Sequence, residues 1–134
     1  MRLALLAAAS GLLLLGATAT VGAHHSFASE FDIDRPVQLN GTVTKVEWIN
    51  PHAWIYVDVK KPDGTVENWA VELGSPNTLV RRGLKKTDLP AGTALKVAGF
   101  QARDASPKAN GVNVTLSDGR ALTISSTGAG APAN

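Results

Sequence analysis

Residues 42–59 read TVTKVEWINPHAWIYVDV, and this stretch decides the fold. Two runs rich in β-branched and aromatic residues, which favour strands, flank a polar break at residues 50–52, Asn-Pro-His. After the break, apolar residues alternate in the period of two that is typical of a half-buried strand. The stretch therefore predicts a long first strand at 36–48, a tight turn, and a second strand at 53–60.

The first strand carries a change of phase. Its apolar residues lie on one face up to Val43 and continue in the opposite phase from Val46 to Trp48. Such a switch indicates a β-bulge, and Gly41 offers a place for tight bending. We expect a long, bent strand that both halves of a closed sheet share.

The rest of the chain supplies further strands and one helix. A Lys-Pro-Asp-Gly turn precedes a third strand at 65–73, and strands are expected at 94–102, 112–116 and 120–125. Between the third and fourth strands, Ser75 and Pro76 predict the start of a helix and Gly83 its end. The prediction is a mainly β fold, a small OB-fold-like antiparallel β-barrel with one short helix between strands three and four. A plain antiparallel barrel or a sandwich is the alternative.

Composition limits the classes of function. The chain has 134 residues, with 13 basic and 11 acidic side chains, so its formal net charge is only +2. This balance gives no reason to expect nucleic acid as a partner. The absence of cysteine excludes disulfides, thiolate metal sites and cysteine nucleophiles. No phosphate loop, nucleophile elbow or zinc-protease motif is present, so we expect a binding protein and not an enzyme.

The N-terminus has the three parts of a secretory signal. A positive start is followed by the apolar residues 3–15 and then by small residues up to Ala23. We assign residues 1–23 to a signal peptide, 24–125 to the β-barrel domain and 126–134 to a disordered tail. The mature protein is expected to be periplasmic or secreted, without a stable membrane anchor. Cleavage after Ala19 or Gly22 is the alternative to cleavage after Ala23.

The three histidines are the candidate metal ligands: His24, His25 and His52. Cleavage after Ala23 would give His24 a free α-amine beside its imidazole, and the two nitrogens can chelate one ion. A third nitrogen from His25 or His52 would complete a nitrogen-rich site that suits Cu(II), and less specifically Ni(II) or Zn(II). In the structural alternative, His24 and His25 belong to a solvated terminus and His52 bonds to the backbone of its turn.

Other side chains near these motifs have simpler interpretations. Glu47 and Glu72 could join a metal site, but we interpret both as solvated residues of the barrel. Trp54 and Tyr56 share one face of the second strand, and a metal-free module could use them to bind a glycan or a small apolar ligand. The basic residues at 81–82 and 85–86 are attributed to a helix end and a loop.

Four segments together resemble a known family. They are AHHSFASEFD at 23–32, LNGTVTKVEWINPHAWIYVDV at 39–59, the W-x-V-E-x-x-S-P-x-x-L-x-R-x-G run at 69–83, and SDGRAL at 117–122. They resemble a family of small exported bacterial proteins that is known chiefly as a domain of unknown function. The resemblance implies an exported single-domain protein and supplies no established activity. A looser similarity to exported copper proteins that begin with histidine rests on His24 alone.

Overall fold

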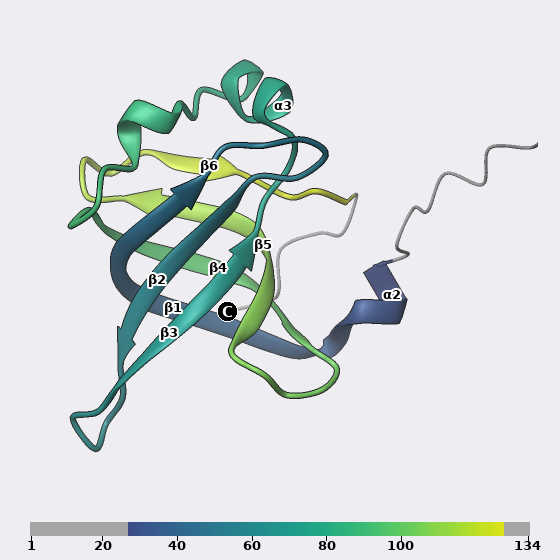
Figure 1. Ribbon diagram of the computed structural model, residues 1–134, viewed down its shortest axis with the longest axis vertical. Coiled ribbons are helices and arrows are strands. Elements are labelled where there is room, and N and C mark those ends of the chain that lie inside the picture. Colours follow the sequence, from purple (N-terminus) through teal and green to yellow (C-terminus); the bar gives the residue numbers. More distant parts are fainter. Residues whose placement is uncertain (1–26, 128–134) are drawn as a thin grey trace, which may run out of the picture.

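The computed structural model describes residues 27–127 of the protein (Figure 1). The predicted signal peptide, His24 and His25 lie outside this range, as do residues 128–134 of the predicted tail. No helix within the described range is both long enough and apolar enough to cross a bilayer.

The described chain is mainly β, as the sequence predicts. It contains six strands, two short α-helices and one 3-10 helix. In chain order the elements are α2 (Phe27–Glu30), β1 (Phe31–Glu47), β2 (Trp54–Lys60), β3 (Val66–Glu72), α3 (Pro76–Arg81), η1 (Lys86–Asp88), β4 (Ala94–Ala102), β5 (Lys108–Leu116) and β6 (Ala121–Thr123).

The strands form one sheet in the order β3-β2-β1-β4-β5-β6. Neighbours in this order are antiparallel, and β3 makes an additional parallel pairing with β5. The long strand β1 pairs with β4 through residues 31–42 and with β2 through residues 41–47, so both halves of the sheet share it (Figure 1).

The bend in β1 has the cause that the sequence suggests. The register with β2 shifts between Val43 and Lys45, which confirms an irregularity where the apolar phase changes. Gly41 lies just before it, where the two strands approach closely. A Cβ at Gly41 would lie 2.4 Å from the carbonyl oxygen of Asp58, so only glycine fits without a backbone shift.

The core lies on the inner face of the strands. Ile55 and Val57 of β2 are buried opposite Val71 and Trp69 of β3, which confirms the predicted alternation in this hairpin. Leu79 of α3 joins the same apolar cluster. Burial of these side chains provides the main driving force for folding, because apolar area removed from water stabilises a fold in proportion to its size.

One predicted strand boundary is wrong. The strand predicted at 112–116 begins earlier, at Lys108 of β5, because residues 108–110 pair in parallel with residues 70–72 of β3. This pairing depends on a distant strand and not on local apolar alternation. Residues 27–30 precede β1 as one helical turn, in which the ring of Phe27 contacts Phe31 and Phe100.

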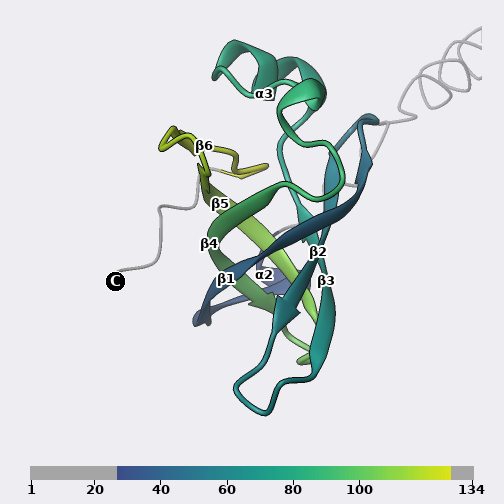
Figure 2. The same cartoon turned by 90° about the vertical axis from the view of Figure 1, so that its left-hand side faces the viewer.

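The helix α3 begins and ends at the residues that the sequence indicates. The Oγ atom of Ser75 accepts a hydrogen bond from the backbone N–H of Thr78 at the N-terminus. Gly83 adopts a left-handed φ of 91°, and the N–H of Leu84 then reaches the carbonyl of Leu79 at 3.0 Å. Figures 1 and 2 both place α3 at one end of the molecule, with the β2–β3 turn at the opposite end.

Candidate functional site: a buried carboxylate beside His52

The turn between β1 and β2 delivers the imidazole of His52 to the end of β3. The next residue, Ala53, already bonds to the main chain beyond β3, since its N–H donates to Gly74 and its carbonyl accepts from Leu73. With the backbone fixed in this way, Nδ1 of His52 lies 2.9 Å from Oε1 of Glu72. The imidazole is therefore held by a side-chain carboxylate.

Glu72 is buried, which corrects its interpretation as a solvated residue. It lies opposite Trp54 in the β2–β3 ladder, and opposite residues of an antiparallel pair share one face of the sheet. This is the outer face, yet Glu72 is only 6% exposed. Side chains from outside the hairpin must therefore cover it.

Three polar groups converge on the same carboxylate oxygen. In addition to His52, the hydroxyl of Ser126 donates to Oε1 of Glu72 at 2.8 Å, and Nδ2 of Asn110 approaches it at 3.4 Å. Nδ2 of Asn110 also donates to the Oγ atom of Ser126 at 2.7 Å. Glu72 is thus the centre of a polar cluster built by the β1–β2 turn, β3, β5 and the segment after β6.

The environment of Glu72 disfavours its charge. Burial raises the pKa of Glu72, while the hydrogen bond from Ser126 and the neighbouring His52 act in the opposite direction. Asn110 is wholly buried, and its Oδ1 atom has no hydrogen-bond partner within the described residues. The cluster therefore contains a buried hydrogen-bond acceptor, Oδ1 of Asn110, to which no group in residues 27–127 donates.

The arrangement can orient an imidazole, but it does not pair His52 with a serine. Ser126 donates its hydrogen bond to the carboxylate of Glu72 and not to His52, so the described residues lack the serine–histidine contact of an activated serine nucleophile. With Nδ1 of His52 on Glu72, Nε2 is the ring nitrogen left to bind a ligand. The side chain of His52 is 39% exposed, so part of the imidazole is open to solvent.

The segment that follows the two N-terminal histidines is anchored close to this cluster. Phe27 contacts Phe100 with ring centroids 5.7 Å apart. Phe100 is the ladder partner of Asn110, and Asn110 is the ladder partner of Glu72. The first described residue thus packs against Phe100, which lies on the same row of the sheet as the buried carboxylate.

An ion pair strengthens this anchor. The carboxylate of Glu30, at the end of α2, lies 2.7 Å from the ammonium of Lys108 on β5. Both charged groups act electrostatically on Glu72, which places them near the cluster.

Only one of the three predicted metal ligands lies in the described structure. No group of three or more histidine, cysteine, aspartate or glutamate side chains with metal-binding geometry occurs among residues 27–127. The described structure contributes His52 and Glu72, and any further ligands from His24 and His25 lie outside it. Whether the three histidines meet stays a prediction.

Trp54 and Tyr56 lie next to each other on the outer face of β2, and both are half-buried. The hydroxyl of Tyr56 donates to Oε2 of Glu47 at 3.3 Å. The ammonium of Lys45 lies 5.0 Å from the centre of the Tyr56 ring. Trp54 is therefore the less engaged of the two aromatic side chains.

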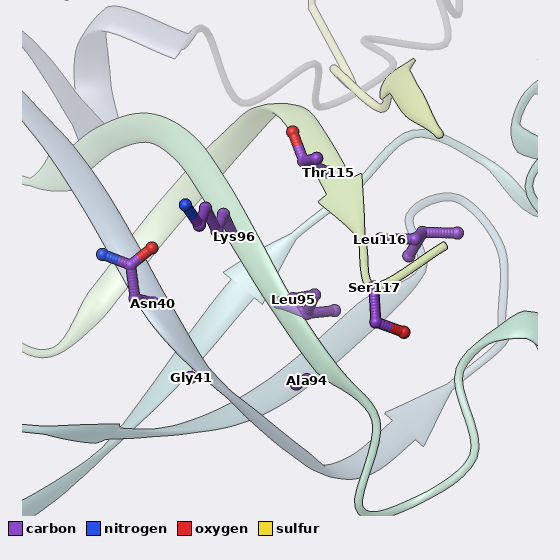
Figure 3. Close-up of a pocket in the computed structure, with 8 residues that line it drawn as sticks. All are labelled: Asn40, Gly41, Ala94, Leu95, Lys96, Thr115, Leu116 and Ser117. Carbon is purple, nitrogen blue, oxygen red and sulfur yellow. The ribbon is translucent and has the colours of Figure 1, made fainter. Parts of the chain in front are cut away.

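Two cavities of the described domain lie elsewhere on the sheet. The cavity in Figure 3 has a volume of about 270 Å³ and is lined by residues of β1, β4 and the end of β5, including Asn40 and Lys96. A second cavity of about 450 Å³ extends toward β6 and shares Lys96 and Thr115 with the first. Neither cavity is lined by His52, Trp54 or Tyr56.

Neither Asn110 nor Ser126 was indicated by the sequence patterns. Asn110 fell in a segment that lacked apolar alternation, and Ser126 fell at the start of the predicted tail. A buried amide needs hydrogen-bond partners and would have pointed to a polar cluster, but the burial of Asn110 is visible only in the structure.

Comparison with known proteins gives a family and no activity. No curated protein and no solved structure matches this chain. A family model, described as a family of unknown function (DUF6152), matches residues 11–113. The chain therefore belongs to this family of unknown function.

Proposed function

We propose that this protein is a small exported binding protein for Cu(II), with nitrogen ligands from His24, His25 and His52. The observation that carries the proposal is the 2.9 Å contact between Nδ1 of His52 and Glu72. Histidine ligands in metal sites usually donate their second ring N–H to a carboxylate or carbonyl, which fixes the tautomer and orients the ring. Glu72 performs this role for His52 and directs Nε2 to the metal.

The length of the N-terminal segment supports a shared site. His24 and His25 precede Phe27 by three and two residues, and an extended chain spans about 3.5 Å per residue. Phe27 packs against Phe100, whose row of ladder partners contains Asn110 and Glu72. A segment of this length can bring an imidazole from the anchored Phe27 toward the exposed edge of His52.

Cu(II) suits the proposed ligands better than the alkaline earth ions. Imidazole and amine nitrogens are typical ligands of Cu(II), Ni(II) and Zn(II), and affinity for a given nitrogen site generally peaks at Cu(II). Mg²⁺ and Ca²⁺ prefer sites made of several oxygens. With no cysteine in the chain, a thiolate site for Cu(I) is excluded.

The proposal is tested by Cu(II) titration of protein recovered from the periplasm, with its N-terminus read from the intact mass. We expect a chain that begins at His24 and retains one copper. His52→Ala should weaken binding at least tenfold, whereas Ile49→Ala, an exposed residue of the same turn, should leave it unchanged. Equal affinity of His52→Ala and the parent would remove His52 from the site.

Export and the barrel architecture belong to the same proposal. Residues 1–23 would be removed on export, which leaves a periplasmic or secreted domain. We further propose that the sheet is an OB-type barrel. The order of three strands, a helix and further strands supports this, as does the β3–β5 pairing that joins distant strands of the sheet.

The second candidate is a metal-free ligand-binding or interaction module that uses the outer aromatic face of β2. The placement of Trp54 and Tyr56 on one half-buried face favours it. The ammonium of Lys45 over the ring of Tyr56 counts against stacking of a sugar there. Binding in a glycan array that Trp54→Ala abolishes, in protein free of metal, would select this candidate.

A further inference from the structure

One end of the domain carries the net positive charge of the described chain. Arg2 is the one basic residue outside residues 27–127, so this range holds 12 basic and 11 acidic residues. We define the basic cap as residues 76–89, which contain α3 and η1, together with the β5–β6 turn at 117–120. The cap has five basic and two acidic residues, a net charge of +3, whereas the rest of the described range has a net charge of −2. The basic residues of the cap are Arg81, Arg82, Lys85, Lys86 and Arg120.

The β5–β6 turn is joined to the rest of the cap by Arg120. Its guanidinium lies 3.1 Å from the carboxylate of Asp88 and 2.8 Å from that of Asp118. It also donates a hydrogen bond to the carbonyl of Gly83. The two acidic residues of the cap are therefore both engaged by one arginine.

The positive charges of the other four basic residues of the cap are exposed and not neutralised by an ion pair within residues 27–127. Within residues 27–127 none of them forms an ion pair, and all four side chains are exposed. The guanidinium of Arg82 donates to the neutral carbonyl of Ser125, and that of Arg81 donates to the hydroxyl of Thr78. Neither partner neutralises a positive charge.

An apolar side chain lies among these charges. Val80 of α3 is 48% exposed, while its neighbour Leu79 is fully buried in the core. The cap lies at the end of the molecule opposite the β2–β3 turn, where no other strand or helix of the described domain projects beyond it (Figures 1 and 2). It can therefore approach a flat surface.

We propose that the basic cap docks the protein on an anionic lipid surface. Each lysine or arginine near such a surface is attracted by its negative potential, and the attraction falls off within a Debye length. An exposed valine between the charges can insert at the boundary between headgroups and acyl chains, as the apolar residues of peripheral helices do. The proposal is independent of copper binding, because it uses none of the histidines.

The chemistry of the cap favours lipid over nucleic acid. Single-stranded nucleic acid is usually bound by aromatic side chains that stack on bases, and residues 76–89 and 117–120 contain no aromatic residue. The two cap lysines are point charges, which satisfy mobile headgroups without a fixed geometry. A lipid surface also uses Val80, for which a phosphate backbone has no partner.

The test is co-sedimentation of the full chain with vesicles of phosphatidylglycerol and phosphatidylcholine in equal parts, and with vesicles of phosphatidylcholine alone. The variant is Lys85→Gln/Lys86→Gln. The matched control is Lys60→Gln/Lys96→Gln, which removes the same charge from two exposed lysines outside the cap that form no ion pair in the described range. Any binding through the apolar residues 3–15 is common to all variants and cancels in the comparison.

We expect binding to the anionic vesicles that weakens with salt. Each cap lysine should contribute about fivefold, so the cap variant should bind about 25-fold more weakly and the control within about twofold of the parent. Val80→Ser should weaken binding without changing its salt dependence. Equal losses of vesicle binding in both double variants would overturn the proposal. Tighter binding of the protein to duplex DNA than to vesicles would also overturn it. So would release of the protein from vesicles by inorganic phosphate at the same concentration as the lipid.

Discussion

Trp54 and Glu72 are direct partners in the β2–β3 ladder and lie on one face of the hairpin. Trp54 was considered for an aromatic ligand site, and Glu72 for a metal site. The imidazole of His52 contacts the carboxylate of Glu72, and Trp54 follows His52 by two residues in the chain. The two candidate functions therefore concern neighbouring parts of one surface, and a reporter at Trp54 can distinguish them.

Cu(II) bound at His52 should quench the fluorescence of Trp54, because a paramagnetic ion at short range deactivates an excited indole. Trp54→Phe should remove most of the quenching that Cu(II) causes in the parent protein. Trp69→Phe is the control, since Trp69 lies on the inner face of β3 and is buried. If Trp54→Phe is quenched to the same fraction as the parent, the metal does not lie beside this residue.

Glu72→Gln should lower the affinity for Cu(II) by about 10- to 100-fold, the range typical of changes to a residue that orients a metal-binding histidine. The amide keeps the size of the side chain but loses the negative charge that lies beside Nδ1 of His52. Glu67→Gln, on the same strand and bonded to Trp69 and Lys61, is the control. Calorimetric titration of both variants measures the difference. An unchanged affinity in Glu72→Gln would show that the carboxylate does not prepare His52 for metal.

Leu79→Ala should reduce the free energy of unfolding by about 2 to 5 kcal/mol, because Leu79 is fully buried and alanine would leave a cavity. Its neighbour in α3, Val80, is 48% exposed, and Val80→Ala should change stability by less than about 0.5 kcal/mol. Urea denaturation of the two variants gives both values. Similar losses in the two would contradict the packing of α3 on the core.

Gly99→Ala should destabilise the protein by at least about 1 to 3 kcal/mol, the usual range for overpacking. A Cβ at this position would lie 2.2 Å from the carbonyl oxygen of Asn110, which is backbone and cannot move without disturbing the β4–β5 ladder. Ala98→Ser, at the preceding position, is the control. If thermal unfolding shows that Gly99→Ala is as stable as the parent, β4 and β5 do not approach this closely at Gly99.

Local patterns were sufficient to predict the hairpin and the helix. Ile55, Val57 and Val71 alternate with outward residues, and this alternation alone gives the buried face. Ser75 and Gly83 mark the ends of α3 through capping chemistry that involves near neighbours in sequence. These features depend on contacts within a few residues or across one turn.

The polar cluster could not be predicted in the same way. Alternation in β3 correctly places Glu72 on the outer face, and outer residues are normally solvated. Its burial comes from Ser126, 54 residues away, and from the parallel pairing that brings Asn110 beside it. Sequence indicated His52 as a candidate, but its carboxylate partner required the tertiary structure.

The network of Asp88 in the basic cap should make stability depend on acidic pH. A hydrogen bond from the backbone N–H of Lys85 lowers the pKa of Asp88, and the guanidinium of Arg120 lowers it further. A carboxylate with a lowered folded-state pKa stabilises the fold above its unfolded pKa. That stabilisation is lost as the pH falls through the folded value, which lies below 3.8.

Asp88→Asn should therefore reduce stability at neutral pH and flatten its decline between about pH 5 and pH 2. Asp34→Asn is the control, because Asp34 is exposed and forms no ion pair within residues 27–127. The measurement is the denaturant midpoint of the three proteins across this range. If Asp88→Asn loses stability on acidification as steeply as the parent, the carboxylate does not link η1 to Arg120 in solution.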